Sequence, residues 1–132
     1  MIDDDAAGLG WHVSMDEPVA QQKFDLYTVL LHEMGHVLGF TQDYPSFADR
    51  VERGPDDLTF FVGSDFVAAL DETGEHLATD ALFHDLMSSE LEPGIRKLPS
   101  ALDVSILEAC YEDALAQDLA RNGLPADDLF IE

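Results

Sequence analysis

The stretch "LLHEMGHVLGFTQDY", residues 30–44, places His32, Glu33 and His36 in a run that is otherwise almost wholly apolar. Burying three ionisable groups among apolar side chains is costly unless they are paired or bound to a metal ion. The stretch therefore predicts a metal site, whose remaining parts must come from elsewhere in the chain.

The surrounding residues predict one buried helix. Asp25 can cap its first turn, and Gly39 fits the left-handed conformation that ends a helix after Leu38. A helix that is apolar all round is expected to be buried. The apolar residues here occupy nearly every side: Leu26, Tyr27, Val29, Leu30, Leu31, Met34, Val37 and Leu38.

The pattern H-E-x-x-H gives this helix its chemistry. His32 and His36 are four residues apart, so both project from one face and can hold one metal ion. Glu33 is displaced around the helix and can act on a metal-bound water as a general base. Imidazole nitrogen favours zinc. The motif alone arises by chance on exposed amphipathic helices, but the predicted burial of this helix favours metal binding.

The continuation "HEMGHVLGF", residues 32–40, resembles the metzincin clan of zinc endopeptidases, whose extended signature is H-E-x-x-H-x-x-G-x-x-H. Gly39 matches the glycine of that signature. Gln42, a poor zinc ligand, stands where the signature has its third histidine, with Asp43 beside it. The sequence thus departs from the common pattern at one ligand.

A second stretch, "GEHLATDALFHDLMSS" (residues 74–89), resembles the leishmanolysin-like branch of the metzincins. In that branch the third histidine comes after a long insertion, shortly before an acidic-Leu-Met triplet. His76, followed by Leu77, and the triplet at residues 85–87 match this arrangement. "FFVG" and "LPSALDVSIL" also resemble this branch, and "DDDAAGLGW" ahead of the helix is similar to bacterial matrixin-like proteins.

The resemblance implies a site assembled from the helix and the later stretch. The expected zinc ligands are His32, His36 and His76. Glu33 is the expected general base, and Met87 is expected to form the apolar floor of the Met-turn beneath the metal. His84, three residues before the methionine, is the alternative third ligand.

Four other residues bear on the site. Some zincins take a glutamate ligand from a later helix; Glu52 and Glu72 are formally available, but neither lies in a predicted helix. His12 belongs to a predicted strand. Ser89 stands where many relatives have a tyrosine that helps to stabilise the transition state, so this helper is expected to be missing.

The chain carries 28 acidic and six basic residues, for a formal net charge of −22. Such a surface repels phosphate backbones and anionic lipid, so neither nucleic acid nor a membrane surface is an expected partner. A solvated acidic face explains the acidic clusters, and calcium binding by one of them is the alternative. These clusters are Asp3-Asp4-Asp5, Asp56-Asp57 and Asp127-Asp128.

The remaining patterns complete an α+β fold, which the resemblance makes zincin-like (metzincin). Residues 10–15 and 58–63 are predicted strands, residues 41–57 are irregular, and residues 64–70 fit a helix or a strand. A turn centres on Gly74, a loop follows, and Ser100 with Asp103 forms a capping box that opens a C-terminal helix. Cys110, the single cysteine, lies in that helix and is expected to be a small residue of the protein core.

One domain is expected over residues 1–132, with its buried active-site helix, its C-terminal helix and a truncated N-terminal sheet. The abrupt start, without a signal peptide, suggests the rear part of a longer protease domain, and the resemblance implies a secreted, extracellular protein. The expected activity is zinc-dependent hydrolysis of peptide or protein substrates, with the peptide added as a strand along residues 10–15. The alternatives are a zinc-binding module without turnover and a structural segment of a large secreted adhesin.

Overall fold

The computed structural model describes residues 4–78 and 85–122, so His84 and the acidic end of the chain lie outside it. Within these residues the protein is α+β, as predicted, with three α-helices and two small sheets. No helix in these ranges is long and apolar enough to cross a membrane. In chain order the elements are β1 (Trp11–His12), β2 (Phe24–Asp25), α1 (Leu26–Val37), α2 (Pro45–Ala48), β3 (Val51–Arg53), the 3₁₀ turn η1 (Pro55–Asp57), β4 (Thr59–Val62), β5 (Val67–Leu70) and α3 (Ala101–Asn122).

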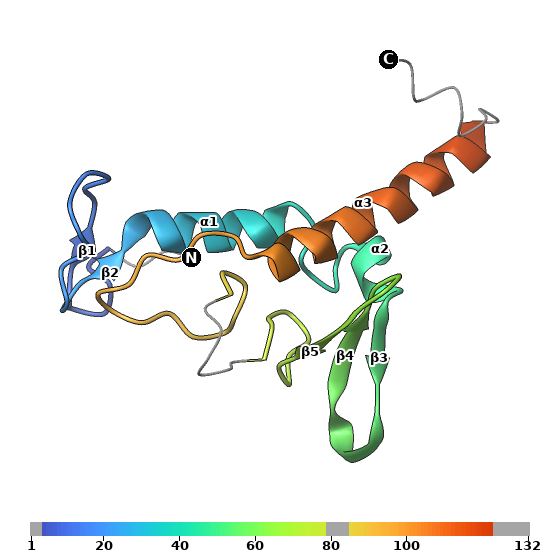
Figure 1. Ribbon diagram of the computed structural model, residues 1–132, viewed down its shortest axis with the longest axis horizontal. Coiled ribbons are helices and arrows are strands. Elements are labelled where there is room, and N and C mark those ends of the chain that lie inside the picture. Colours follow the sequence, from blue (N-terminus) through green and yellow to red (C-terminus); the bar gives the residue numbers. More distant parts are fainter. Residues whose placement is uncertain (1–3, 79–84, 123–132) are drawn as a thin grey trace.

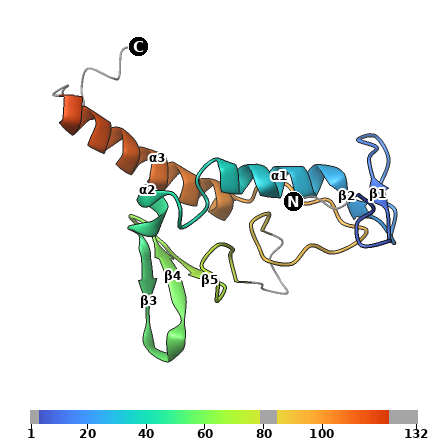
Figure 2. The ribbon, with the colours of Figure 1, turned by 180° about the vertical axis from the view of Figure 1, so that it is seen from behind.

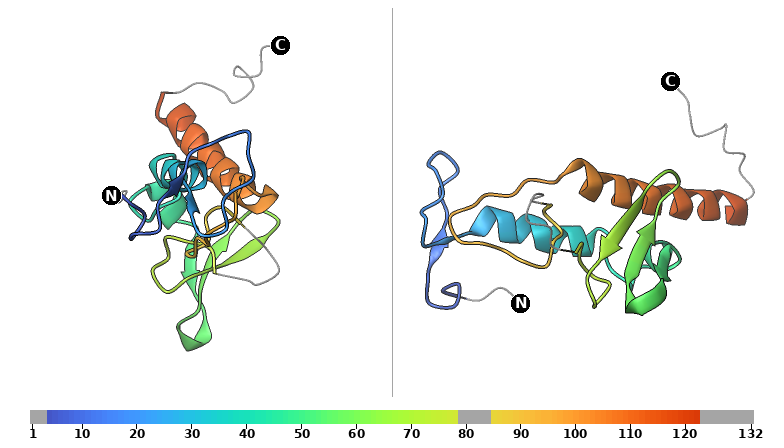
Figure 3. Two further views of the ribbon diagram at one scale, coloured as in Figure 1. Left: turned by 90° about the vertical axis from the view of Figure 1, so that its left-hand side faces the viewer. Right: turned by 60° about the horizontal axis from the view of Figure 1, so that its bottom comes forward.

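The two long helices run along the length of the molecule, with the β3–β4–β5 sheet to one side of them (Figure 1). The view from behind places the small β1–β2 sheet at the start of α1 (Figure 2). The loop of residues 85–99 runs back along α1 toward β2 before it turns into α3 (Figure 3). The amide of Gly94 donates to the carbonyl of Lys23 at 2.8 Å, which fixes the far end of this loop.

The start of α1 confirms the predicted cap. Asp25 accepts from the backbone amide of Thr28 at 3.2 Å and from its hydroxyl at 2.7 Å. Arg96 donates to both carboxylate oxygens, each at 2.9 Å. Burial raises the pKa of Asp25, but hydrogen bonds from Arg96 and Thr28 outweigh this and hold the pKa below its ordinary value. At the other end Gly39 has a φ of 128°, where glycine is favoured, as predicted.

The predicted burial of α1 on all sides is wrong. Thr28, Val29, His32 and Gly35 are buried, but the opposite side presents apolar side chains to solvent. On that side Leu30, Met34 and Leu38 are about half exposed, and Val37 is 85% exposed. A sequence that is apolar all round reports what a helix can bury, whereas the number of packed faces depends on what lies beside it.

The segment of residues 41–57 was expected to be irregular, and this is also wrong. It contains α2, β3 and η1. Pro45 is the first residue of α2, a position that tolerates a missing amide, and Phe47 is fully buried. The partner of β3 is β4, which also pairs with β5 in one antiparallel sheet, so residues 67–70 form a strand. The predicted strand at residues 10–15 is shorter than expected, because only Trp11–His12 pairs with β2.

Beyond β5, isolated β-bridges connect the sheet to the segments around Gly74 and Met87. Leu77 bridges Leu70 in the antiparallel sense and Ser88 in the parallel sense. The amide of Leu77 donates to the carbonyl of Met87 at 2.8 Å. These contacts bring the two stretches together beside α1. The core behind them contains Cys110, as predicted, and burial raises the pKa of its thiol to about 11.

Candidate metal centre

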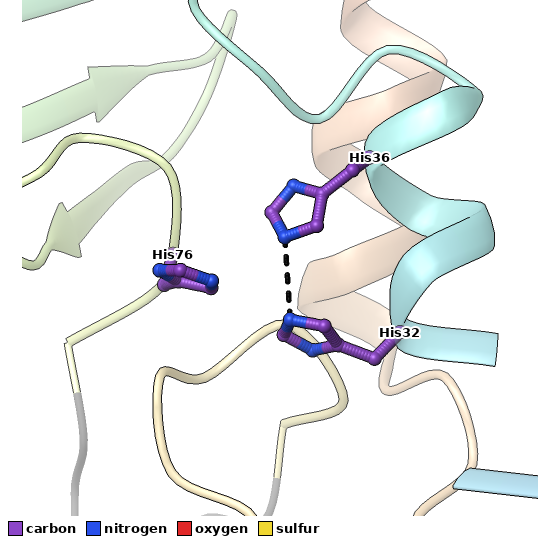
Figure 4. Close-up of side chains that lie close together, drawn as sticks. All are labelled: His32, His36 and His76. Carbon is purple, nitrogen blue, oxygen red and sulfur yellow. Dashed lines mark hydrogen bonds between the residues drawn. The ribbon is translucent and has the colours of Figure 1, made fainter. Parts of the chain in front are cut away.

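Three histidine side chains converge at one point. His32 and His36 project from successive turns of α1, and His76 faces them from the loop after β5 (Figure 4). The ring centroids are 4.9, 5.2 and 5.0 Å apart, a nearly equilateral triangle. One nitrogen of each ring lies within 4.8 Å of the other two. Within residues 4–78 and 85–122 this is the only group of three His, Cys, Asp or Glu side chains that could hold a metal ion.

Each of the three rings has its Nδ1 atom bound to an oxygen. These oxygens are the carbonyl of Leu86 for His32 (2.8 Å), the carbonyl of Phe40 for His36 (2.7 Å) and the Asp71 carboxylate for His76 (3.1 Å). A carbonyl or an ionised carboxylate can only accept, so each Nδ1 carries the proton. The Nε2 atoms are thereby left as the lone-pair nitrogens, and this is the usual arrangement around metal-binding histidines.

The Nε2 atoms of the two helix histidines repel each other unless a cation lies between them. Nε2 of His32 and Nε2 of His36 lie 3.2 Å apart, the contact dashed in Figure 4. With both Nδ1 atoms protonated, two neutral rings would point lone pairs at each other. Two nitrogens held tetrahedrally by one zinc ion at about 2.0–2.1 Å lie roughly 3.3–3.4 Å apart, close to the observed spacing. The donor set therefore fits a metal ion.

Protonation of His32 is the competing way to relieve the conflict, and the surroundings oppose it. Burial lowers the pKa of His32, and the neighbouring rings of His36 and His76 lower it further, against the carbonyl of Leu86. A lowered pKa keeps the ring neutral, which is the form that binds metal.

The orientation of His76 depends on Asp71. Burial raises the pKa of Asp71, but hydrogen bonds from Thr73 and His76 outweigh it, so the pKa lies below its ordinary value. The carboxylate is thus the acceptor that holds the ring of His76 in place.

Met87 packs against α1 at Gly35, the residue before His36. It is 1% exposed, and a Cβ atom added to Gly35 would lie 2.3 Å from its sulfur. Only glycine allows this close approach. The middle of the H-E-x-x-H motif and the methionine of the second stretch therefore fit each other directly, which gives Gly35 a role that the sequence did not reveal.

The turn that carries Met87 is held by the first turn of α3. The Asp103 carboxylate accepts from the amide of Leu86 at 2.8 Å and from that of Met87 at 3.1 Å, and Asp103 is 2% exposed. The same carboxylate accepts from the amide of Ser100 at 2.8 Å, which confirms the predicted capping box. Because the carbonyl of Leu86 orients His32, one buried carboxylate links α3 to the three-histidine cluster.

Glu33, the predicted general base, lies beside the cluster and faces solvent. Burial is the dominant effect on the pKa of His32 and lowers it, while the negative charge of Glu33 opposes that shift. The carboxylate of Glu33 is therefore accessible from solvent.

The other candidates do not join the cluster. Glu52 is exposed in β3, and Glu72 is exposed in the loop before His76. His12 is buried in β1, where its Nε2 has no hydrogen-bond partner among the described residues. The alternative ligand His84 lies outside the described residues.

Sequence reasoning missed the residues that orient the three rings. Asp71 precedes His76 by five residues across a tight turn, and this short separation was the available signal. The capping box identified Asp103 but not its bonds to Leu86 and Met87, which lie 17 and 16 residues away.

Comparisons of the chain with family models, curated proteins and solved structures gave no match. The site therefore rests on the residues and their geometry alone.

Proposed function

We infer that the three-histidine centre binds zinc and that the chain is a zinc-dependent endopeptidase of the metzincin kind. The observation that carries this proposal is the convergence of three Nε2 lone pairs whose Nδ1 atoms are all hydrogen-bonded. Three imidazoles with an open fourth position are typical of catalytic zinc, whereas structural sites are closed by a fourth protein ligand. Such a protease would act outside the cell.

The chain's own residues supply the steps of peptide hydrolysis. His32, His36 and His76 would hold the ion, which when bound supplies Lewis acidity and lowers the pKa of water to about 7. Glu33 takes the proton of the attacking water and then delivers it to the leaving amine. Its exposure supports both transfers. Met87, which is buried against Gly35, would form the apolar floor of the site.

A zinc-binding module without turnover is the second candidate. Two observations favour it: β1 is only two residues long, and the apolar side of α1 opposite the core is exposed. A peptide that adds as a strand needs a longer edge than Trp11–His12 offers within the described residues. The third candidate, a structural segment of protease ancestry, binds no zinc.

Glu33→Gln separates the three. For an endopeptidase, the zinc-loaded wild type cleaves fluorogenic peptides, and Glu33→Gln lowers the rate by about 10²–10⁴-fold while it keeps one zinc per chain. Zinc content is measured by atomic absorption and cleavage by fluorogenic peptides.

The other outcomes identify the rivals. One zinc per chain without cleavage by either protein indicates the binding module. No stoichiometric zinc in the wild type contradicts both zinc-based functions. Equal cleavage by wild type and Glu33→Gln contradicts the role given to Glu33.

A further inference from the structure

The loop that presents His76 is organised by its own first residue. Asp71 accepts from the amide and the hydroxyl of Thr73 at 3.1 and 2.6 Å and from the amide of Gly74 at 3.1 Å. Its backbone amide donates to the carbonyl of His76 at 2.9 Å. Gly74 has a φ of 71°, which suits glycine at this turn. These bonds fix the shape of the loop but not its position relative to α1.

A second set of bonds fixes that position. Glu75 accepts from the hydroxyl of Thr41 at 3.2 Å and from the backbone amide of Gln42 at 3.1 Å. The side-chain amide of Gln42 donates back to the carbonyl of Thr73 at 3.3 Å. All three bonds join the histidine loop to the chain just beyond the glycine that ends α1.

The contact is also close in space. A Cβ atom on Gly74 would lie 2.0 Å from Nε2 of Gln42, so the side chain of Gln42 covers the turn directly. Gly74 is buried, although Glu72 and Thr73 before it in the loop are exposed. The position that lacks a histidine in the H-E-x-x-H-x-x-G stretch is thus occupied by a residue that contacts the loop carrying His76.

We propose that Glu75 and Gln42 are positioning residues, which hold the loop of residues 71–76 against the end of α1 so that His76 meets the two helix histidines. The proposal rests on the zinc site inferred above. Glu75 precedes His76 directly, so a displacement of its carboxylate moves the backbone of the ligand. His76 comes from outside the helix, and its position relative to His32 and His36 depends on such contacts between the two segments.

The chain offers a matched control for the test. Glu72 lies in the same loop, is exposed, and makes no hydrogen bond or ion pair with the described residues. Glu72→Gln and Glu75→Gln each remove one negative charge near the site. Only Glu75→Gln removes an acceptor that is in use, because both carboxylate oxygens of Glu75 accept a hydrogen bond and an amide offers one oxygen. Thr41→Val removes the donor on the other side and keeps the shape of the side chain.

Zinc affinity is measured by competition with a chromogenic chelator, together with the visible spectrum of the cobalt-loaded protein and the thermal unfolding of the metal-free protein. Glu75→Gln is expected to weaken zinc binding about tenfold and to alter the cobalt spectrum, because loss of residues that orient ligands typically costs 10–100-fold in metal affinity. Thr41→Val should show a smaller loss. Glu72→Gln should bind like the wild type, and unfolding should be unchanged in all three.

Equal zinc affinity of Glu75→Gln and Glu72→Gln overturns the positioning role and leaves the zinc site intact. A wild type that binds no zinc overturns both the site and the role. The positioning role is also overturned if Glu75→Gln binds zinc more weakly and its metal-free form unfolds at a lower temperature than the metal-free wild type. The loss of affinity would then reflect general destabilisation.

Discussion

Replacing His76 with alanine is expected to abolish stoichiometric zinc binding. The change removes one of three Nε2 ligands and leaves two, too few for the sites zinc normally occupies. His76 is partly exposed, so its loss should leave the metal-free fold intact. The variant therefore tests the ligand rather than the stability of the chain.

Thermal unfolding with and without zinc gives the clearest readout. A ligand that binds only the folded state stabilises it by about 2.7 kcal/mol at 100 times its dissociation constant. The wild type should show this zinc-dependent rise in unfolding temperature, and His76→Ala should not. His84→Ala is the matched control and should behave like the wild type. The opposite result, with zinc lost in His84→Ala and kept in His76→Ala, would falsify the assignment of His76.

Replacing Asp103 with alanine is expected to destabilise the protein by about 3 kcal/mol or more. The backbone amides of Leu86 and Met87 lose their acceptor, and each buried donor left unpaired costs roughly 1–3 kcal/mol. The half of the capping box in which the Asp103 carboxylate accepts from the amide of Ser100 is lost as well. Zinc affinity should fall too, because the carbonyl of Leu86 orients His32.

Urea unfolding of the metal-free protein measures the first effect, and chelator competition measures the second. Glu108→Ala, an exposed change on the same helix, should lie within about 0.5 kcal/mol of the wild type. Asp103→Asn keeps one acceptor oxygen and should fall between the two. An Asp103→Ala protein as stable as Glu108→Ala would contradict the link between α3 and the metal centre.

Much of the fold and of the candidate site could be predicted from local sequence patterns. The cap at Asp25, the end of α1 before Gly39 and the capping box at Ser100 were predicted because their signals lie within a few residues. The spacing of His32 and His36 predicted a shared face, and the resemblance supplied His76, which the structure brings beside them.

What could not be predicted depends on contacts between distant parts of the chain. Glu75 and Gln42 are 33 residues apart, and no periodicity indicates that they meet. The pairing of β3 with β4 and the exposure of Val37 likewise depend on which elements lie side by side. Asp71 and His76 are only five residues apart, but polar residues in a loop are expected at the surface, so this short separation did not single out their bond.

The most direct test of the metal centre is a crystal structure of the zinc-loaded protein, with anomalous diffraction recorded on both sides of the zinc absorption edge. We expect one anomalous peak per chain, about 2.0–2.1 Å from Nε2 of His32, His36 and His76. A peak bound through His84 in place of His76, or zinc only on exposed carboxylates with none at the three histidines, would contradict the account.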